Sequence, residues 1–465
     1  MTKEVKNKNI EELLRKADLP NRRAEVWHPF YQGKIEIVSK VKIDNLDDFA
    51  VWYTPGVAKP CKMIKEEINA TKKYRPYSVY NLTNKWNNVA VVSDGSRVLG
   101  LGNIGPEASM PVMEGKALLF KYLGGVDAFP VCLDCHNTDE IITAVKWLQP
   151  TFGGINLEDI SQPKCFEILD TLRAARDVRI PVWHDDQQGT ATIVVAGMLN
   201  ALKYQNKKLN ETLFSMIGAG AANMAVARVM ITAGVPKKNI IMMDSKGILH
   251  QGRNDIKVVK DKYNLKWDMC LNSNSEGRTG DIAAGMKDTD MVIAASKPGP
   301  GTIKPEWIKA MADNPIVFAC ANPIPEIWPW EAKDAGAEII ATGRSDFPNQ
   351  VNNSLGFPGI FRGTLDVMGI AITDEMCIAA AIELAKTAEE KGLSPDYIIP
   401  TMDDWEVFPR EAVAVGQQSI KEGGARLKLT RQEAFEKAEA LIKRARGQTH
   451  LLMDHGYIPK APQVD

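Results

Sequence analysis

The sequence predicts an α/β protein of two or three domains that ends in helices. The chain has 465 residues, and a single hydrophobic core rarely serves more than about 250–300 residues. From about residue 188, short apolar runs alternate with segments of helical spacing, which is typical of a largely parallel sheet. Residues 374–448 are helical in pattern. We therefore expect three parts, at 1–187, 188–373 and 374–465.

Composition restricts the class of protein. The formal net charge of −1 predicts no general attraction to nucleic acid or to a membrane surface. No apolar run approaches the roughly 18–20 residues that a membrane span needs. The N-terminus lacks the apolar segment of a secretion signal, and its acidic residues Glu4, Glu11 and Glu12 argue against a mitochondrial presequence. Seven scattered cysteines favour reduced thiols, so we expect a cytoplasmic protein.

The part before residue 188 mixes short elements. A Pro/Gly-rich segment begins at Tyr53. The turn sequence Asp94-Gly95-Ser96 predicts a hairpin over 88–100. A helix is expected at 110–122.

Two motifs in this part are expected to carry no chemistry. Residues Cys132–His136 fit haem-attachment, redox and zinc half-site patterns, but neither an export signal nor a second ligand pair accompanies them. A buried cysteine at a strand end is the better interpretation. Residues Gly100–Gly105 form a complete GxGxxG, but a proline follows and the turn sequence precedes it. We do not expect this motif to be a dinucleotide loop.

Two pairs of adjacent carboxylates follow apolar, strand-like runs. Glu158 and Asp159 come after one run, and Asp185 and Asp186 come after the next. Ligands of α/β sheets bind at the carboxyl ends of strands. Carboxylates that converge there repel one another unless a cation neutralises them, and all-oxygen ligand sets suit Mg²⁺ or Mn²⁺. For either pair alone, a solvated strand-to-helix turn is the alternative.

A dinucleotide-binding unit is predicted from residue 213 onward. A short apolar strand runs into Gly218 and Gly220, a helix follows, and a second strand ends in Asp244. The two glycines let the backbone approach a pyrophosphate at the helix N-terminus. Asp244 stands where a carboxylate meets the adenosine ribose. The cofactor-binding residues predicted here are Gly218, Ala219, Gly220, Ala221, Ala222, Asn223, Asp244 and Ser245.

Regular elements surround this unit. A helix is expected at 189–204, and buried strands are expected at 289–296, 316–322 and 338–342. The sheet is therefore predicted to be a Rossmann-type, largely parallel one.

These motifs resemble the malic enzymes, specifically their short prokaryotic-type branch. The resemblance runs from Tyr53–Ala58 to Phe357–Gly363 and includes long blocks in order. Those blocks are Gly100–Ala108, Val112–Lys121, Gly153–Ile160 and His184–Thr190. The resemblance implies an N-terminal α/β malic domain, an NAD-binding domain and C-terminal helices. It also implies oxidative decarboxylation of L-malate to pyruvate and CO₂ with NAD⁺ or NADP⁺ and a divalent metal.

The resemblance assigns roles to residues. It implies that Glu158, Asp159 and Asp186 bind the metal, that Lys116 is the general base and Tyr53 the general acid, and that Asp185 assists proton transfer. It places Arg97, Asn352 and Asn353 near the substrate and Asn322 near the nicotinamide. The chain departs from the family pattern at Asn223, where glycine is usual, and at Gln188, where histidine is frequent.

The chemistry gives each implied role a reason. Chelation by the metal acidifies the 2-hydroxyl of malate. Lys116 would take the hydroxyl proton as hydride leaves for the nicotinamide, and Tyr53 would protonate the enol after CO₂ departs. We expect the neighbouring cation and Arg97 to depress the pKa of Lys116.

Assembly and cofactor choice complete the expectations. The N-terminal region is too thin for a large core of its own, so we expect a homodimer in which it packs across the two-fold, with Tyr53 a candidate to serve the neighbouring site. We expect NAD⁺ to be preferred and NADP⁺ to be used weakly, because an unneutralised Asp244 repels a 2′-phosphate. Ser245 and Lys246 argue the other way.

Three alternatives stay open. A malolactic enzyme would use the same residues and release lactate. An amino-acid dehydrogenase would have two domains but no carboxylate cluster, and would survive chelation. A catalytically silent NAD-binding regulator would not need Tyr53, Lys116 and the acidic residues together.

Overall fold

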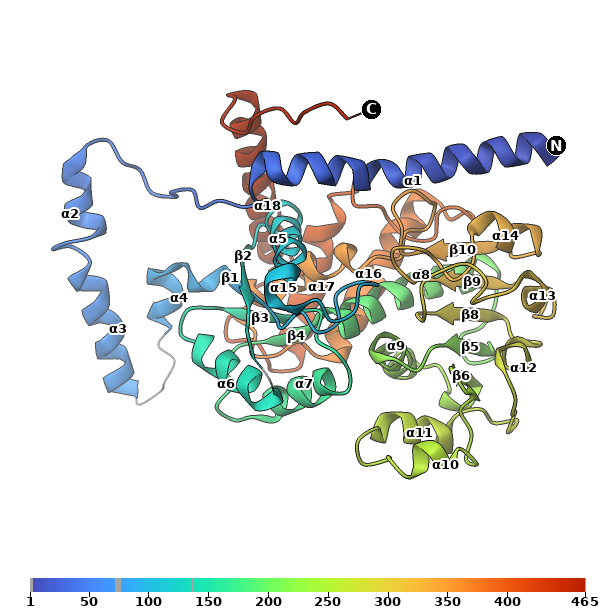
Figure 1. Cartoon of the computed structure of the whole chain (residues 1–465). Coiled ribbons are helices and arrows are strands. Elements are labelled where there is room, and N and C mark those ends of the chain that lie inside the picture. The colour runs from blue at the N-terminus through green and yellow to red at the C-terminus, as the bar shows by residue number, and fades with distance from the viewer. Residues whose placement is uncertain (1–2, 72–76, 136, 465) are drawn as a thin grey trace.

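Two sheets and a set of C-terminal helices form the body of the molecule (Figure 1). The computed structural model describes residues 3–71, 77–135 and 137–464. The predicted α/β class with a Rossmann-like parallel sheet is confirmed. The domain boundaries stay a prediction.

The first sheet has four parallel strands in the order β2-β1-β3-β4. The strands are β1 (Asn88–Ser93), β2 (Asp127–Cys132), β3 (Gly154–Leu157) and β4 (Val182–His184). The connecting helices are α5 (Gly105–Gly124), α6 (Thr138–Leu148) and α7 (Lys164–Ala174). A π-helical turn, η3 (Asp185–Gly189), leads from β4 into α8 (Thr190–Tyr204). The sheet therefore puts the chain's two carboxylate pairs at the ends of adjacent strands.

The second sheet has the order β10-β9-β8-β5-β6-β7, with only β7 antiparallel. Its strands are β5 (Phe214–Ile217), β6 (Ile240–Asp244), β7 (Gly247–Ile248), β8 (Met291–Ala294), β9 (Ile316–Ala319) and β10 (Ile339–Thr342). Its helices are α9 (Ala221–Thr232), α10 (Asn254–Lys257), α11 (Asn264–Asn272), α12 (Ile282–Met286), α13 (Pro305–Ile308) and α14 (Pro329–Asp334). The strand order reverses between β5 and β8, the place where such sheets bind ligands. The predicted helix at 189–204 and the three predicted strands are confirmed.

The C-terminal helices pack on both sheets. They are α15 (Phe357–Asp366), α16 (Asp374–Lys391), α17 (Val407–Lys421) and α18 (Arg431–Asp454). Helix α15 passes so close to α17 that a Cβ at Gly363 would overlap the carbonyl of Ala412. Phe357 and Phe361 of α15 pack on Phe120 of α5. Helix α15 is thereby fixed against α5, the helix that carries Lys116.

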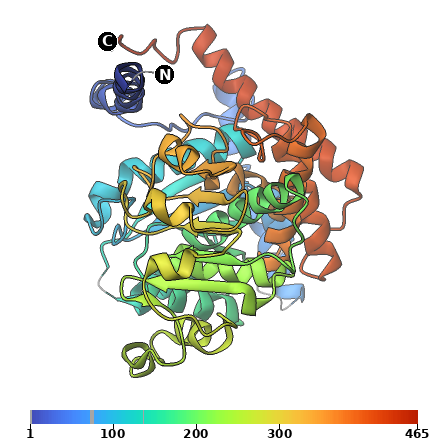
Figure 2. The same ribbon diagram turned by 90° about the vertical axis from the view of Figure 1, so that its right-hand side faces the viewer.

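The N-terminal elements precede the first sheet in the chain. They are α1 (Lys3–Tyr31), η1 (Leu46–Asp48), α2 (Phe49–Trp52), α3 (Ala58–Thr71), α4 (Ser78–Leu82) and η2 (Asn84–Trp86). Figure 1 shows α2 and α3 standing to one side of the first sheet. Helix α1 is joined to the C-terminal tail, because Trp27 donates to the carbonyl of Pro462 (2.9 Å) and Tyr31 to that of Pro459 (2.8 Å). Figure 2 shows this helix and the tail next to each other.

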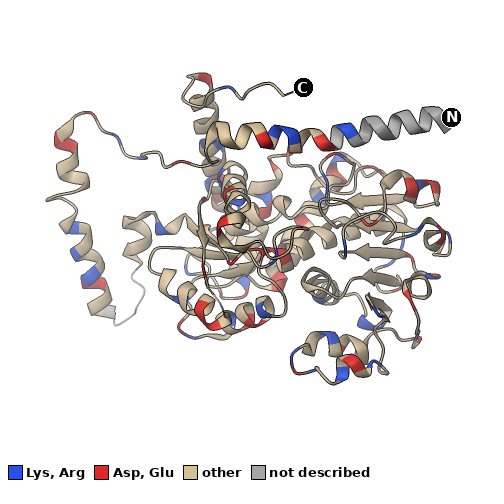
Figure 3. Cartoon of the chain, in the orientation of Figure 1, with Lys and Arg blue, Asp and Glu red and all other residues tan. Residues whose placement is uncertain are grey.

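Residues 32–71, which we call the N-terminal arm, expose many apolar side chains. The exposed large ones are Ile35, Ile37, Val38, Val41, Ile43, Leu46, Phe49, Val51, Trp52, Tyr53, Val57, Met63 and Ile68. A soluble monomer rarely exposes so extended an apolar surface. Charged side chains elsewhere lie mainly on helices and loops, with both signs interspersed (Figure 3). Among the described residues, no helix combines the length and apolarity needed to cross a bilayer.

One predicted element is wrong. The segment 88–100 is not a hairpin, because β1 pairs in parallel with β2 on one side and β3 on the other. Both edges of β1 are thus occupied, and the turn sequence instead opens a loop in which Val98 and Gly102 form an isolated bridge and Gly95 accepts from Ile104 and Gly105. The helix predicted at 110–122 begins earlier, at Gly105.

Candidate active site

The two carboxylate pairs converge at the carboxyl end of the first sheet. Strands β3 and β4 are hydrogen-bonded neighbours, with Leu157 opposite His184. Each strand ends there, so Glu158 and Asp159 lie beside Asp185 and Asp186. The backbone N–H of Asp159 donates to Oδ2 of Asp186 across 2.8 Å.

Lys116 reaches this cluster from α5. Its Nζ lies 2.5 Å from Oδ2 of Asp185 and 2.9 Å from Oε1 of Glu158. The ring of Phe357 covers another side, with its centroid 4.3 Å from Nζ. All three polar side chains are buried. The structure therefore brings the predicted base into direct contact with two of the four carboxylates.

In the chain without a metal, the pKa of Lys116 is shifted in the direction opposite to the one expected beside a cation. Burial lowers this pKa, but the charges of Asp185 and Glu158 raise it more, so it lies above its ordinary value. Arg97, which was expected to depress it, donates from Nη1 to the carbonyl of Leu99 instead (2.9 Å). In the ligand-free chain Lys116 is thus held protonated.

The negative charges of the carboxylates repel one another. Burial, and then the charge of Asp186, raise the pKa of Asp159 to about 8. Burial raises the pKa of Glu158 well above its ordinary value; Lys116 opposes this, and the neighbouring acids add to it. The Oδ2 atom of Asp159 is buried without a hydrogen-bond partner. A cluster of this kind suits a divalent cation, whose charge would relieve the repulsion.

The side chains are not arranged as a finished metal site. Within 3–71, 77–135 and 137–464, no three acidic, histidine or cysteine side chains stand in coordinating geometry. Glu158 has other partners here: its Oε1 contacts Lys116 and its Oε2 accepts from Asn156 (2.8 Å). The oxygen-only donor set fits Mg²⁺ or Mn²⁺ by its chemistry.

The remaining residues predicted to act on the substrate do not all lie at the acidic cluster. Asn353 lies beside Gly189 of the π-helical turn, close to Asp185. Asn352 donates to the carbonyl of Gly343 (3.3 Å) and caps a short 3₁₀ turn, η5 (Asn353–Leu355). Arg97 is tied to Asp159 through its backbone, by an N–H bond of 2.9 Å to the Asp159 carbonyl. Tyr53 is 71% exposed on the N-terminal arm, so the chain does not bring it to its own Lys116.

The predicted dinucleotide loop joins β5 to α9. Gly218 has a φ of +100°, and a Cβ there would come within 2.6 Å of the carbonyl of Ala295, which follows β8. The first turn of α9 has no side-chain cap, so its N–H groups are open to an anion. Asn223 replaces the usual glycine by bonding back to the strand, from Nδ2 to the carbonyls of Ile217 (2.8 Å) and Gly218 (2.9 Å). The loop is thus braced at this position by a side chain.

Asp244 is not the free carboxylate that was expected. Arg253 donates to both of its oxygens (3.0 and 2.8 Å), and Lys266 lies 2.6 Å from Oδ2. Burial raises the pKa of Asp244, but the hydrogen bonds from Arg253 and Lys266 lower it by more. The pKa therefore lies below its ordinary value. Ser245 and Lys246 are exposed, and Lys246 pairs with Asp255 (3.2 Å). The premise of an unneutralised Asp244 was therefore wrong.

The part of the chain around the first sheet meets the part around the second sheet at Asn322. Gly100 begins the GxGxxG sequence Gly100–Gly105, which is not expected to bind a dinucleotide. A Cβ on Gly100 would lie 3.1 Å from the carbonyl of Asn322. This motif thus packs where the second sheet approaches the first. Glu326 holds the same loop, accepting from the backbone N–H groups of Ser296 (2.8 Å) and Ala321 (3.0 Å). Sequence patterns gave no sign of Glu326, because its partners are the nearby backbone N–H of Ala321 and the N–H and hydroxyl of Ser296, 30 residues away.

Comparison with known proteins identifies this arrangement. The family model "Malic enzyme, N-terminal domain" matches residues 32–173, and "Malic enzyme, NAD binding domain" matches 187–420. The chain belongs to the malic enzyme family. It is 46% identical to the bifunctional malic/malolactic enzyme of Bacillus subtilis, over 89% of this chain and 96% of that one. It is 48% identical to the NAD-dependent malic enzyme of Geobacillus stearothermophilus, over 85% and 78%.

A solved structure agrees with the malic enzyme assignment. The crystal structure of Entamoeba histolytica malic enzyme matches with a TM-score of 0.91 at 47% identity, covering 97% of this chain and 92% of that one. The resemblance inferred from the motifs is confirmed. The family assignment excludes the alternative of an amino-acid dehydrogenase.

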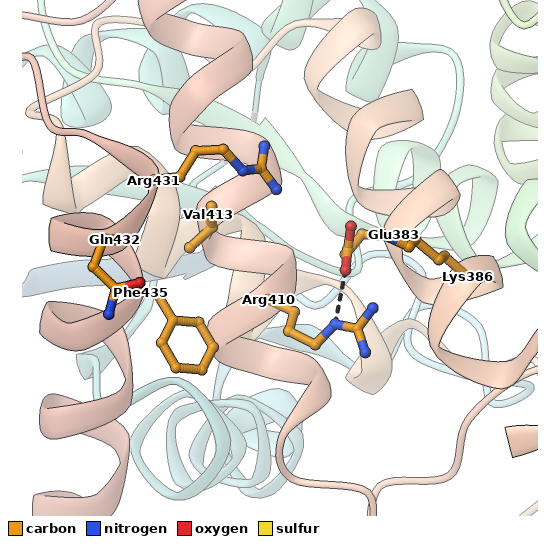
Figure 4. A pocket seen from close by; sticks show the side chains of 7 residues that line it. All are labelled: Glu383, Lys386, Arg410, Val413, Arg431, Gln432 and Phe435. Carbon is orange, nitrogen blue, oxygen red and sulfur yellow. Dashed lines mark hydrogen bonds and ion pairs between the residues drawn. The ribbon is translucent and has the colours of Figure 1, made fainter. Parts of the chain in front are cut away.

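A separate pocket in this malic enzyme family member contains none of the predicted site residues. It has a volume of about 270 Å³ and lies among α16, α17 and α18 (Figure 4). Its lining residues are Glu383, Lys386, Arg410, Val413, Arg431, Gln432 and Phe435. Arg410 is already paired with Glu383 (2.7 Å) and Glu390 (2.6 Å). Much of its positive charge is therefore neutralised by the protein itself.

Proposed function

We propose that this protein oxidises and decarboxylates L-malate to pyruvate and CO₂, reducing NAD⁺ or NADP⁺, with Mg²⁺ or Mn²⁺ as the metal. The observation that carries the proposal is the buried contact of Lys116 with Asp185 and Glu158 at the strand ends. A base, an acidic cluster and a dinucleotide loop are the groups that this reaction requires.

Metal binding is proposed for three carboxylates. Glu158, Asp159 and Asp186 would hold the cation, which as a Lewis acid would acidify the 2-hydroxyl of malate and stabilise charge as CO₂ leaves. The support is the raised pKa of Glu158 and Asp159 and the partnerless Oδ2 of Asp159. In this proposal Asp185 does not bind the metal and keeps its contact with Lys116.

Lys116 is proposed as the base of the oxidation step. It would accept the proton of the 2-hydroxyl as hydride passes from C2 to the nicotinamide, giving oxaloacetate and NAD(P)H. It must first be deprotonated, which the ligand-free contacts with Asp185 and Glu158 oppose. Turning Glu158 away from Lys116 removes one of these two charges. Arg97, Asn352 and Asn353 are proposed to bind the substrate, and Asn322 to bind the nicotinamide.

Tyr53 is proposed to act in a homodimer. As the general acid it would protonate the enol of pyruvate after CO₂ leaves. Its own chain leaves it exposed on the N-terminal arm, among the other exposed apolar side chains of that arm. A second copy would cover this apolar surface and receive Tyr53 in its site.

Both nucleotides are proposed as cofactors, with NAD⁺ preferred. Asp244 lies at the strand end that meets the ribose, which favours NAD⁺. Arg253 and Lys266 neutralise it, so a 2′-phosphate would meet less repulsion than a free carboxylate gives. The seven cysteines are free thiols, in keeping with a cytoplasmic location.

The proposal is tested by following nucleotide reduction with L-malate, with and without Mn²⁺. Metal-dependent formation of NADH or NADPH with pyruvate as product supports it. The malolactic reaction is the second candidate, because the Bacillus subtilis relative is named for both activities. Lactate as the main product, without net reduced nucleotide, would select that reaction instead.

A further inference from the structure

Trp183 touches the proposed reaction centre from within the sheet. It lies in β4 and is fully buried. Its indole Nε1–H donates to Oδ1 of Asp185, at 3.1 Å. No motif singled out this residue, because a tryptophan in a buried strand has the pattern of an ordinary core side chain.

The two oxygens of Asp185 have different neighbours. Oδ2 faces Lys116 at 2.5 Å, while Oδ1 takes the Trp183 hydrogen bond. Oδ1 also lies against Gly189, where an added Cβ would overlap it. Hydrogen bonds to buried charged groups are among the stronger ones in proteins, so the loss of this donor would leave Oδ1 unsatisfied.

The indole is itself held in place. The ring of Phe361 on α15 meets it edge-on, with centroids 6.3 Å apart and an interplanar angle of 79°. Both side chains belong to the apolar cluster that includes Phe120 of α5. The ring therefore presents its N–H to Asp185 from a fixed position.

We propose that Trp183 is a positioning residue for the oxidation step: its N–H fixes Asp185 so that Oδ2 alone faces Lys116. This inference rests on the proposed function and adds a residue to it. Phenylalanine at 183 would keep an aromatic ring in the core but has no N–H to donate to Oδ1 of Asp185. Asp185 would then turn or share its oxygens, and Lys116 would lose its fixed orientation towards the substrate hydroxyl.

The test compares Trp183→Phe with a packing control. We expect Trp183→Phe to lower kcat for malate oxidation about 10-fold or more, as loss of a charged-group hydrogen bond predicts. KM for malate and nucleotide should change less than about twofold, because neither ligand contacts the indole in this proposal. Decarboxylation of added oxaloacetate should be retained, because Lys116 acts as the base in the oxidation of malate, the step that precedes decarboxylation.

Leu365→Ala is the matched control, since it loosens the same apolar cluster from α15 and leaves both the indole N–H and the Phe361 ring in place. It should lower thermal stability yet leave kcat for malate near wild type. Equal kcat losses in both variants would show that packing alone matters and would overturn the inference. If Trp183→Phe does not fold, β-(3-benzothienyl)alanine at 183 replaces the N–H by sulfur at nearly unchanged shape, and the same kcat loss is expected.

A structural readout separates this inference from the proposed function. In the crystal structure of Trp183→Phe, we expect Asp185 to have turned so that the Oδ2 contact with Lys116 is lost or lengthened. An unchanged contact would overturn the inference, whatever the activity. A wild-type protein inactive on malate would instead overturn the proposed function, while the orientation of Asp185 would still decide the role of Trp183.

Discussion

Nζ of Lys116 lies 2.5 Å from Oδ2 of Asp185, in a buried contact between α5 and the turn after β4. The residues are 69 positions apart in sequence, and the parallel order of the first sheet brings them together. The contact joins the proposed base to the acidic cluster.

Replacing Lys116 should separate the two halves of the reaction. Lys116→Ala should reduce malate oxidation by about 10²–10⁴-fold, the usual worth of a general base. Decarboxylation of oxaloacetate should survive in part. Lys121→Ala, on the same helix but paired with Asp127 near the surface, is the control and should act like wild type. Equal loss of both partial reactions would contradict the assignment of Lys116 as the base.

Replacing Asp186 should weaken metal binding. Asp186→Asn removes one charge from the proposed ligand set, so Mn²⁺ affinity measured by calorimetry should fall and more metal should be needed for activity. Asp177→Asn, an exposed acid paired with Lys146, is the control. Unchanged Mn²⁺ affinity in Asp186→Asn would rule out this residue as a ligand.

Mixed dimers test whether Tyr53 serves the neighbouring site. Tyr53→Phe and Lys116→Ala chains are each expected to be nearly inactive. After subunit exchange, about a quarter of the wild-type activity should return, because half of a random two-fold mixture would be heterodimers with one complete site. No recovery, with exchange proven by mass spectrometry, would confine each site to a single chain.

Arg253 should influence nucleotide choice. Arg253→Ala would leave Asp244 with more net negative charge, so kcat/KM for NADP⁺ should fall more than kcat/KM for NAD⁺. Arg278→Ala, which loses a pair with Glu276, is the control. A larger fall for NAD⁺ would mean that the neutralised Asp244 does not govern discrimination.

Glu411 should make stability depend on pH. It is fully buried in α17, both carboxyl oxygens lack partners, and burial followed by the charge of Glu383 raises its pKa. The folded chain therefore holds a proton that the unfolded chain releases. This makes the free energy of unfolding fall as pH rises above the unfolded pKa of Glu411, up to its folded pKa.

Glu411→Gln removes that dependence. The urea midpoint of the variant relative to wild type should be higher at pH 8 than at pH 5. An equal difference at both pH values would show that Glu411 carries no such linkage.

Short-range patterns predicted much of the fold. Continuous apolar runs marked β8, β9 and β10, and the carboxylate pairs lay at adjacent strand ends because the strands are parallel. The hairpin failed because a turn sequence does not reveal that both edges of β1 are taken.

Long-range charge contacts could not be predicted in the same way. Arg253 and Lys266 reach Asp244 from positions 9 and 22 residues further along, where no periodic pattern points to it. The raised pKa of Lys116 likewise depends on two buried carboxylates, Glu158 and Asp185, which follow β3 and β4. Trp183 and Glu326 were missed because their hydrogen bonds appear only once the loops are placed.

The most direct test of the proposed reaction follows ¹³C-labelled L-malate with NAD⁺ or NADP⁺ by NMR, in the presence of Mn²⁺ or excess chelator. The account predicts that pyruvate, CO₂ and reduced nucleotide form in equal amounts with Mn²⁺, that none forms with chelator, and that Lys116→Ala forms them about 10²–10⁴-fold more slowly. Lactate as the product, or full activity under chelation, would contradict it.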